Sequence, residues 1–286
     1  MKVLVTGASG FIGRHLIGSL LKIGHSVVAS STSALKASKF EWFPNVSFIE
    51  YRIGEAYDDR DLYSFFEEPD VLIHLAWDGL PDFKGLHHLE RNLPAHLNFL
   101  GNLINNGLTD LTITGTCLEY GLVEGELNEN MPPQPALAYA IAKDQLRQSI
   151  ELIGSTVALD FKWVRLFYMY GEGQHPKSLI PQLDMAIQNG DQEFNMSGGE
   201  QLRDYLPVAE VGKLLCKIGL QSEVTGIINC CSGKPISVKR FVESYMSSIG
   251  SNIRLNLGVY PYPDYEPMAF WGNTGKLNTI SDDDSR

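Results

Sequence analysis

The chain is poor in positive charge and cysteine and has no long hydrophobic run. Its 286 residues carry 23 Lys and Arg against 34 Asp and Glu, a formal net charge of −11. This excess of acid disfavours nucleic acid and anionic membrane surfaces as main partners. No apolar run approaches the ~20 residues that a membrane span requires. The first core-like run begins at Val3, so no signal peptide is expected and we predict a cytoplasmic protein.

Cysteine and histidine do not form a metal-binding pattern. The four cysteines lack the spacing of zinc ligands, and the adjacent Cys230 and Cys231 cannot easily form a disulfide with each other. His87 and His88 are also adjacent, but no carboxylate–histidine framework surrounds them. We therefore predict reduced, buried thiols and no metal site.

Strand-like and helix-like patterns alternate from residue 1 to about 168, and then the pattern changes. Such alternation is typical of an α/β protein with a Rossmann-like, doubly wound parallel sheet. Helices are expected between the strands, among them Asp61–Glu67 and Leu89–Asn106. We predict a dinucleotide-binding domain over 1–168, to which 204–231 returns, and a smaller C-terminal substrate-binding lobe from 169–203 and 232–286. The predicted strands are Lys2–Thr6, Ser26–Ser30, Ser47–Tyr51, Val71–Leu75, Leu111–Thr114 and Lys162–Tyr168.

Three glycines separate the first predicted strand from a helix expected over Phe11–Lys22. Glycine lets the backbone approach a pyrophosphate closely, and the unpaired N–H groups at a helix N-terminus attract the anion. A flexible turn without a ligand is the alternative, but strand, helix and second strand all fall where a dinucleotide fingerprint requires them. The residues assigned to this site are Gly7, Gly10, Phe11, Ile12 and Gly13.

Tyr139 and Lys143 are four residues apart in a segment with helical spacing, so their side chains share one face. An ammonium near a tyrosine lowers its pKa from about 10 and lets it act as an acid–base group. Alone, the pair also fits an ordinary surface contact on a helix. Thr116 supplies a third group, because it follows the strand-like run Leu111–Thr114 at the end where ligands bind in parallel sheets.

Six motifs in this order resemble the extended short-chain dehydrogenase/reductase family, which contains nucleotide-sugar epimerases, dehydratases and ketoreductases. The motifs are Thr6-Gly-x-x-Gly-x-x-Gly13, Asp70-Val-Leu-Ile-His-Leu-Ala76, Thr116-x-x-x-Tyr120-Gly121, Tyr139-x-x-x-Lys143, Arg165-x-x-x-x-Tyr170-Gly171 and Arg203-Asp204-Tyr205. The resemblance implies that Tyr139 is the catalytic acid/base, that Lys143 binds the nicotinamide ribose and tunes Tyr139, and that Thr116 holds the substrate oxygen.

The resemblance also assigns residues to cofactor and substrate. Arg203 is expected on the substrate diphosphate, a role that suits bidentate guanidinium–phosphate geometry. A homodimer is a further expectation from the family, through Leu89–Asn106 and Tyr139–Gly154. Leu75 and Ala76 are assigned to the cofactor, and the aromatic residues assigned to the nucleotide sugar are Trp77, Phe270 and Trp271.

The second predicted strand runs into Ser30–Ser33 with no acid after it. A carboxylate there would hold the ribose hydroxyls of NAD, whereas hydroxyl groups tolerate the 2′-phosphate of NADP. Ser31 and three cations, Arg14, Lys36 and Arg52, therefore favour NADP(H) over NAD. Arg52 stands where many relatives carry an aspartate near the adenine, and this departure puts that contact in doubt.

The residues in the turn after Thr116 differ between family members that catalyse different reactions. Family dehydratases carry an Asp-Glu pair there, whereas this chain has Cys117 and Leu118. Relatives that epimerise beside a keto group need an extra acid/base pair at positions that Leu118 and Ser178 hold here, although Cys117 and His175 lie close by. The resemblance therefore favours NADPH-dependent reduction of the 4-keto group of a nucleotide-diphosphate 4-keto-6-deoxy sugar, in the synthesis of surface-polysaccharide precursors.

Three alternatives stay open. An epimerase with tightly held NAD would share every catalytic residue. A non-catalytic redox-sensing regulator would keep the glycine turn, but such proteins usually lose the Tyr139–Lys143 pair. A reductase of a non-sugar ketone would give Arg203 no anion to bind.

Overall fold

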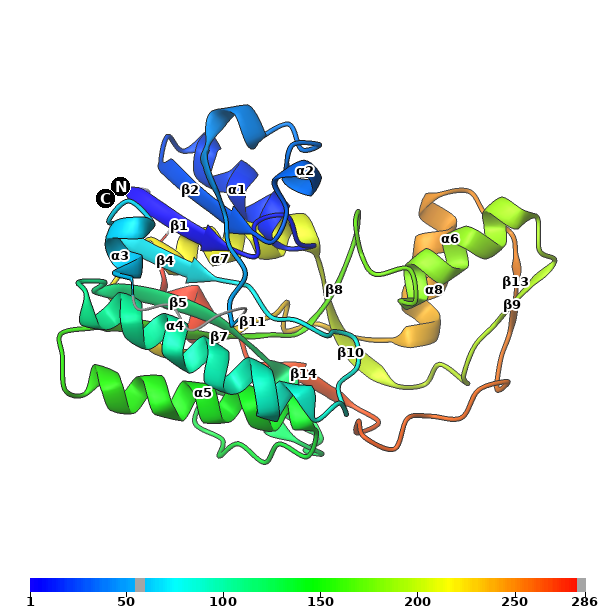
Figure 1. Ribbon diagram of the computed structural model, residues 1–286. Coiled ribbons are helices and arrows are strands. Elements are labelled where there is room, and N and C mark those ends of the chain that lie inside the picture. The colour runs from blue at the N-terminus through cyan, green and yellow to red at the C-terminus, as the bar shows by residue number, and fades with distance from the viewer. Residues whose placement is uncertain (55–59, 282–286) are drawn as a thin grey trace.

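A seven-stranded parallel sheet forms the centre of the computed structural model, which describes residues 1–54 and 60–281. The strand order is β11-β7-β5-β4-β1-β2-β3, so the chain starts in the middle of the sheet and winds outward in both directions (Figure 1). This order confirms the Rossmann-like α/β class. The seven strands are β1 (Lys2–Thr6), β2 (Ser26–Ser31), β3 (Ser47–Glu50), β4 (Val71–His74), β5 (Asp110–Thr116), β7 (Asp160–Leu166) and β11 (Gly226–Cys230).

Helices cover both faces of this sheet because alternate strand residues are apolar on each side. On β1, Val3 and Val5 pack into one core and Leu4 into the other. The first core includes α1 (Gly13–Lys22) and α7 (Val208–Gly219). The second core includes three helices that cover the other face of the sheet (Figure 1). These are α3 (Leu62–Phe65), α4 (Leu93–Asn105) and α5 (Ala138–Gly154).

A smaller lobe stands apart from the sheet in Figure 1 and has a core of its own. It consists of α6 (Leu179–Asn189), β9 (Glu193–Asn195), α8 (Val238–Ser248) and β13 (Arg254–Asn256). Between lobe and sheet lies a three-stranded sheet of β8 (Tyr168–Tyr170), β10 (Leu202–Pro207) and β12 (Pro235–Ser237). A two-stranded sheet joins β6 (Gly125–Leu127) to β14 (Phe270–Gly272). The short remaining elements are α2 (Ala34–Ala37), η1 (Phe43–Asn45), η3 (Cys117–Tyr120) and η4 (Leu277–Thr279).

Some element boundaries differ from those that the sequence predicts. The strand expected over Lys162–Tyr168 divides into β7 and β8, which belong to different sheets. The helix expected over Leu89–Asn106 begins as a π-helical segment, η2 (His88–Asn92), before α4. Pro94 lies in the first turn of α4, where its missing N–H costs nothing. Among the described residues, no helix combines the length and the apolar character that a membrane crossing needs.

Candidate active site

Thr116 is the last residue of β5 and caps η3. Its hydroxyl oxygen accepts a hydrogen bond from the backbone N–H of Leu118 at 3.2 Å. Because the oxygen is used as an acceptor, the hydroxyl proton remains available to donate to a substrate oxygen. The side chain is 7% exposed, so such a bond would form largely out of water.

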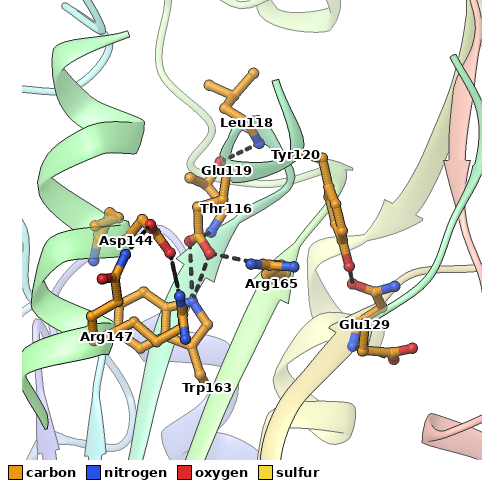
Figure 2. Close-up of polar contacts among 12 residues, drawn as sticks. Thr116, Leu118, Glu119, Tyr120, Glu129, Asp144, Arg147, Trp163 and Arg165 are labelled. Carbon is orange, nitrogen blue, oxygen red and sulfur yellow. Dashed lines mark hydrogen bonds and ion pairs between the residues drawn. The ribbon is translucent and has the colours of Figure 1, made fainter. Parts of the chain in front are cut away.

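Glu119 is a buried carboxylate directly beneath this turn, and Figure 2 shows how its neighbours converge on it. The backbone N–H of Thr116 donates to its Oε1 at 2.8 Å, and Nε of Arg165 donates to its Oε2 at 2.8 Å. Trp163 Nε1 donates to both oxygens, at 3.1 and 2.9 Å. Burial raises the pKa of Glu119, while the charge of Arg165 opposes that rise. The carboxylate thus fixes the turn that carries Thr116.

Tyr139 is the second residue of α5, and its backbone N–H donates to the carbonyl of Phe83 at 3.1 Å. Its ring lies among those of Trp77, Phe83 and His88, at centroid distances of 6.1, 5.7 and 5.3 Å. Burial raises the pKa of Tyr139, and the charge of Glu119 raises it further. The lowered pKa expected from Lys143 is therefore not found, and Tyr139 is a protonated, shielded phenol.

Lys143 lies one turn further along α5 and is 2% exposed. Its ammonium donates to the carbonyl of Thr114 at 2.9 Å and lies 4.1 Å from the ring centroid of Trp77. Burial lowers the pKa of Lys143 to about 7, while the charge of Glu119 opposes this fall. Trp77 contacts both members of the predicted Tyr139–Lys143 pair, so the three side chains form one cluster.

The glycine turn has the geometry of a dinucleotide cradle. Gly7 has φ of +69°, and a Cβ on it would lie 2.9 Å from the backbone nitrogen of Ala76, the residue assigned to the cofactor after β4. A Cβ on Gly13 would lie 2.4 Å from the carbonyl oxygen of Gly7. A side chain at either position would displace backbone. Ser31, at the end of β2, is 8% exposed, and its hydroxyl has no hydrogen-bond partner among the residues described. The residues present therefore fit a nicotinamide dinucleotide.

Arg203 is less accessible than a diphosphate ligand would need to be. Its guanidinium is 2% exposed, and Nη2 donates to Glu266 at 2.9 Å. Nη1 donates to the carbonyls of Leu202 and Met268, at 2.8 and 3.2 Å. The guanidinium lies 4.6 Å from the ring centroid of Phe270, which is itself a 2% exposed core residue. Trp271, by contrast, is half-buried.

Comparison with known proteins identifies the family of this chain. Residues 3–231 match the family described as the NAD dependent epimerase/dehydratase family. The chain belongs to this family. The dTDP-6-deoxy-L-talose 4-dehydrogenase (NAD(+)) of Aggregatibacter actinomycetemcomitans is 30% identical over 275 residues, which cover 95% of this chain and 99% of the relative. The UDP-glucose 4-epimerase of Halalkalibacterium halodurans is 23% identical over 98% of this chain and 89% of its own.

A solved member of the epimerase/dehydratase family has the same fold. The UDP-glucuronic acid 4-epimerase of Bacillus cereus, in complex with UDP-glucuronic acid and NAD, superposes with a TM-score of 0.84 at 23% identity. The match covers 98% of this chain and 92% of that one. The family membership confirms the resemblance drawn from the six motifs.

The predicted preference for NADP is not supported. The family is described as NAD dependent, one relative carries NAD(+) in its name, and one solved neighbour contains NAD. The structure places Arg14 beside the turn at Gly173, where its Nη1 lies 3.4 Å from Glu172. Arg52 interacts with another group of the protein. Nε and Nη2 of Arg14 are buried without a hydrogen-bond partner among the described residues, so this guanidinium can still bind an anion, while the family and the named relative favour NAD.

Glu119 is a structural residue of the site that sequence reasoning missed. It stands inside the motif Thr116-x-x-x-Tyr120, at a position that the motif leaves free. Only the pairing of β5 with β7 brings Trp163 and Arg165 to it. No group of three or more side chains suited to hold a metal ion occurs in residues 1–54 and 60–281.

Proposed function

We propose that this protein transfers hydride between NAD(H) and C4 of a nucleotide-diphosphate 6-deoxy sugar, and that its biosynthetic direction is reduction of the 4-ketone. The proposal keeps the reaction expected from the sequence and replaces NADPH by NADH. A relative of nearly the same length, named as a dTDP-6-deoxy-L-talose 4-dehydrogenase (NAD(+)), supports it. The same name makes dTDP the nucleotide to test first. Surface-polysaccharide precursor synthesis is the setting that the sequence resemblance implies.

The observation that carries the proposal is the turn after Thr116. Burial raises the pKa of the Cys117 thiol, so at neutral pH it remains protonated and is not a base. Leu118 has no ionisable group. Dehydration or epimerisation beside the ketone would need an acid/base pair here, whereas hydride transfer at C4 needs only Thr116, Tyr139 and Lys143.

Each of the three side chains has a different role in the reduction. The bound nicotinamide supplies the hydride. Thr116 donates its hydroxyl proton in a hydrogen bond to the ketone oxygen, and Tyr139 transfers its proton to that oxygen as the alcohol forms. A raised pKa keeps Tyr139 protonated before reaction, which suits an acid. Lys143, when charged, stabilises the phenolate that remains.

The nucleotide sugar is proposed to bind between the dinucleotide-binding domain and the lobe formed by 169–203 and 232–286. Arg203 would exchange Glu266 for the substrate diphosphate, and Trp271 would line the site. Trp77 already contacts Lys143 and lies beside Tyr139, so it would lie near the reacting carbon. Phe270 acts beneath Arg203 as a stacking support.

Oxidation of NADH at 340 nm tests the reaction with two ketones: dTDP-4-keto-6-deoxyglucose, and the ketone that corresponds to C4-oxidised dTDP-6-deoxy-L-talose. Tyr139→Phe removes the acid and should lower kcat roughly 10²–10⁴-fold. Tyr120→Phe is the matched control, because Tyr120 is also buried but donates to Asn229. An unchanged rate in Tyr139→Phe would sink the mechanism.

A 4-epimerase with retained NAD is the second candidate, favoured by the named activity of the Halalkalibacterium halodurans relative. Such an enzyme would use Thr116, Tyr139 and Lys143 twice on the same sugar, first to oxidise C4 and then to reduce the resulting ketone. Purified protein would then hold NAD that does not exchange, and the sugar would rearrange, as seen by NMR, with no net change at 340 nm.

A further inference from the structure

A carboxylate on the neighbouring strand, that of Glu50, lies beside the end of β2, where the sequence has no acid. Ser31 on β2 and Glu50 on β3 are direct partners in the parallel register, so their side chains leave the same face of the sheet. Oε2 of Glu50 accepts a hydrogen bond from the backbone N–H of Ala34 at 2.6 Å. The carboxylate is thereby held against the loop that follows β2.

This loop adjoins the dinucleotide cradle. The backbone N–H of Ala8, in the glycine turn, donates to the carbonyl of Ser30 at 3.1 Å. In dinucleotide folds the pyrophosphate binds at the glycine turn, and the adenosine ribose lies toward the end of the second strand. The buried, unpartnered hydroxyl of Ser31 lies at that end, beside Glu50 in register.

We infer that Glu50 is the residue that selects NAD(H) over NADP(H). From the third strand, its carboxylate takes the role that an acid after the second strand has in other dinucleotide folds: it accepts from a ribose hydroxyl and repels a 2′-phosphate. That phosphate carries close to two negative charges at neutral pH, so its position beside a carboxylate is unfavourable. Nη1 of Arg14 lies 3.4 Å from the exposed carboxylate of Glu172, while its Nε and Nη2 are buried and have no hydrogen-bond partner among the described residues.

This inference rests on the proposed function only for its requirement that a nicotinamide dinucleotide binds. Its test therefore needs no sugar. NADH and NADPH are titrated separately into the purified full chain, freed of cofactor, and the two Kd values are read from quenching of tryptophan fluorescence. Wild-type protein should bind NADH about tenfold or more tightly than NADPH. Equal affinities, or tighter NADPH, would overturn the inference.

Glu50→Gln identifies the residue responsible. Glutamine retains an oxygen that can accept from the N–H of Ala34, so the loop keeps its bond while the charge is lost. NADPH should bind roughly tenfold more tightly to this variant, with little change for NADH. Glu41→Gln, at an exposed glutamate between α2 and η1, is the matched control for loss of one negative charge.

The outcomes separate this inference from the proposed function. A Kd ratio that stays the same in Glu50→Gln, or that changes equally in Glu41→Gln, would overturn the role of Glu50. A wild-type preference for NADH that collapses only in Glu50→Gln would support it, even if no keto-sugar is ever reduced. Failure of every keto-sugar would then count against the proposed reaction alone.

Discussion

Two buried arginine–glutamate pairs flank the site, and they are built alike. Arg165 Nε lies 2.8 Å from Glu119, and Arg203 Nη2 lies 2.9 Å from Glu266. Each guanidinium also lies over an aromatic ring, at 4.3 Å from the centroid of Tyr120 for Arg165 and at 4.6 Å from Phe270 for Arg203. From composition and geometry alone, the two pairs would be assigned the same role.

The difference lies in what surrounds each carboxylate. Both side chains of the Arg165–Glu119 pair are 0% exposed: Arg165 lies on β7, and Glu119 lies in η3, which directly follows the paired strand β5. Glu266 is 13% exposed and belongs to the irregular segment between β13 and β14. A buried charge pair within regular structure cannot exchange partners, whereas a pair on an irregular segment can release its arginine to an anion. The first pair is thus scaffold, and the second is suited to substrate binding.

Breaking the scaffold pair should have the largest effect. Glu119→Gln leaves the charge of Arg165 buried without a counter-charge, which should lower the free energy of unfolding by about 3–5 kcal/mol. Urea denaturation of the cofactor-free chain measures this loss. Glu210→Gln, which removes an exposed pair with Lys213, should change stability by less than about 1 kcal/mol. Equal effects in the two variants would contradict the scaffold assignment.

Breaking the second pair should affect substrate binding more than the fold. Arg203→Met should raise KM for the nucleotide sugar roughly 10–100-fold, because charge-assisted contacts to the diphosphate are lost, with little change in kcat. Steady-state kinetics at several sugar concentrations separates the two constants.

Glu266→Gln is the matched variant for this prediction. It removes the competing carboxylate but leaves the guanidinium of Arg203 in place, so KM should stay the same or fall. A rise in KM equal to that of Arg203→Met would mean that the ion pair itself shapes the site and does not exchange.

The same contrast shows what the sequence can and cannot predict. The alternation of strand-like and helix-like segments was sufficient for the parallel sheet, because strands that bury both faces give short continuous apolar runs such as Val3–Val5. The motif residues Thr116, Tyr139 and Lys143 were identified because their spacing is local. Glu119 and Glu50 were missed because their partners come from neighbouring strands, and strand register cannot be read from one sequence.

The burial of the site side chains could not be predicted from the sequence either. The Tyr139–Lys143 spacing predicted a lowered tyrosine pKa, but the covering rings of Trp77, Phe83 and His88 reverse the direction of the shift. Arg203 was expected to face a ligand, yet its guanidinium already forms an ion pair with Glu266, which is distant in sequence.

The smallest expected effect is a shift in the pH dependence of stability, which distinguishes Glu119 from Glu266 by their influence on the pKa of Lys143. The folded pKa of Lys143 is about 7, below its ordinary 10.5, so between these values the unfolded chain holds a proton that the folded chain lacks. Stability therefore rises with pH through this window. From pH 7 to 9 wild type should gain about 2 kcal/mol relative to Lys143→Met, measured by urea denaturation. Glu119 raises the pKa of Lys143, so Glu119→Gln should move the start of this rise to lower pH. Glu266→Gln should not change the pH at which the rise begins. A shift in this variant would mean that Glu266, like Glu119, affects the pKa of Lys143.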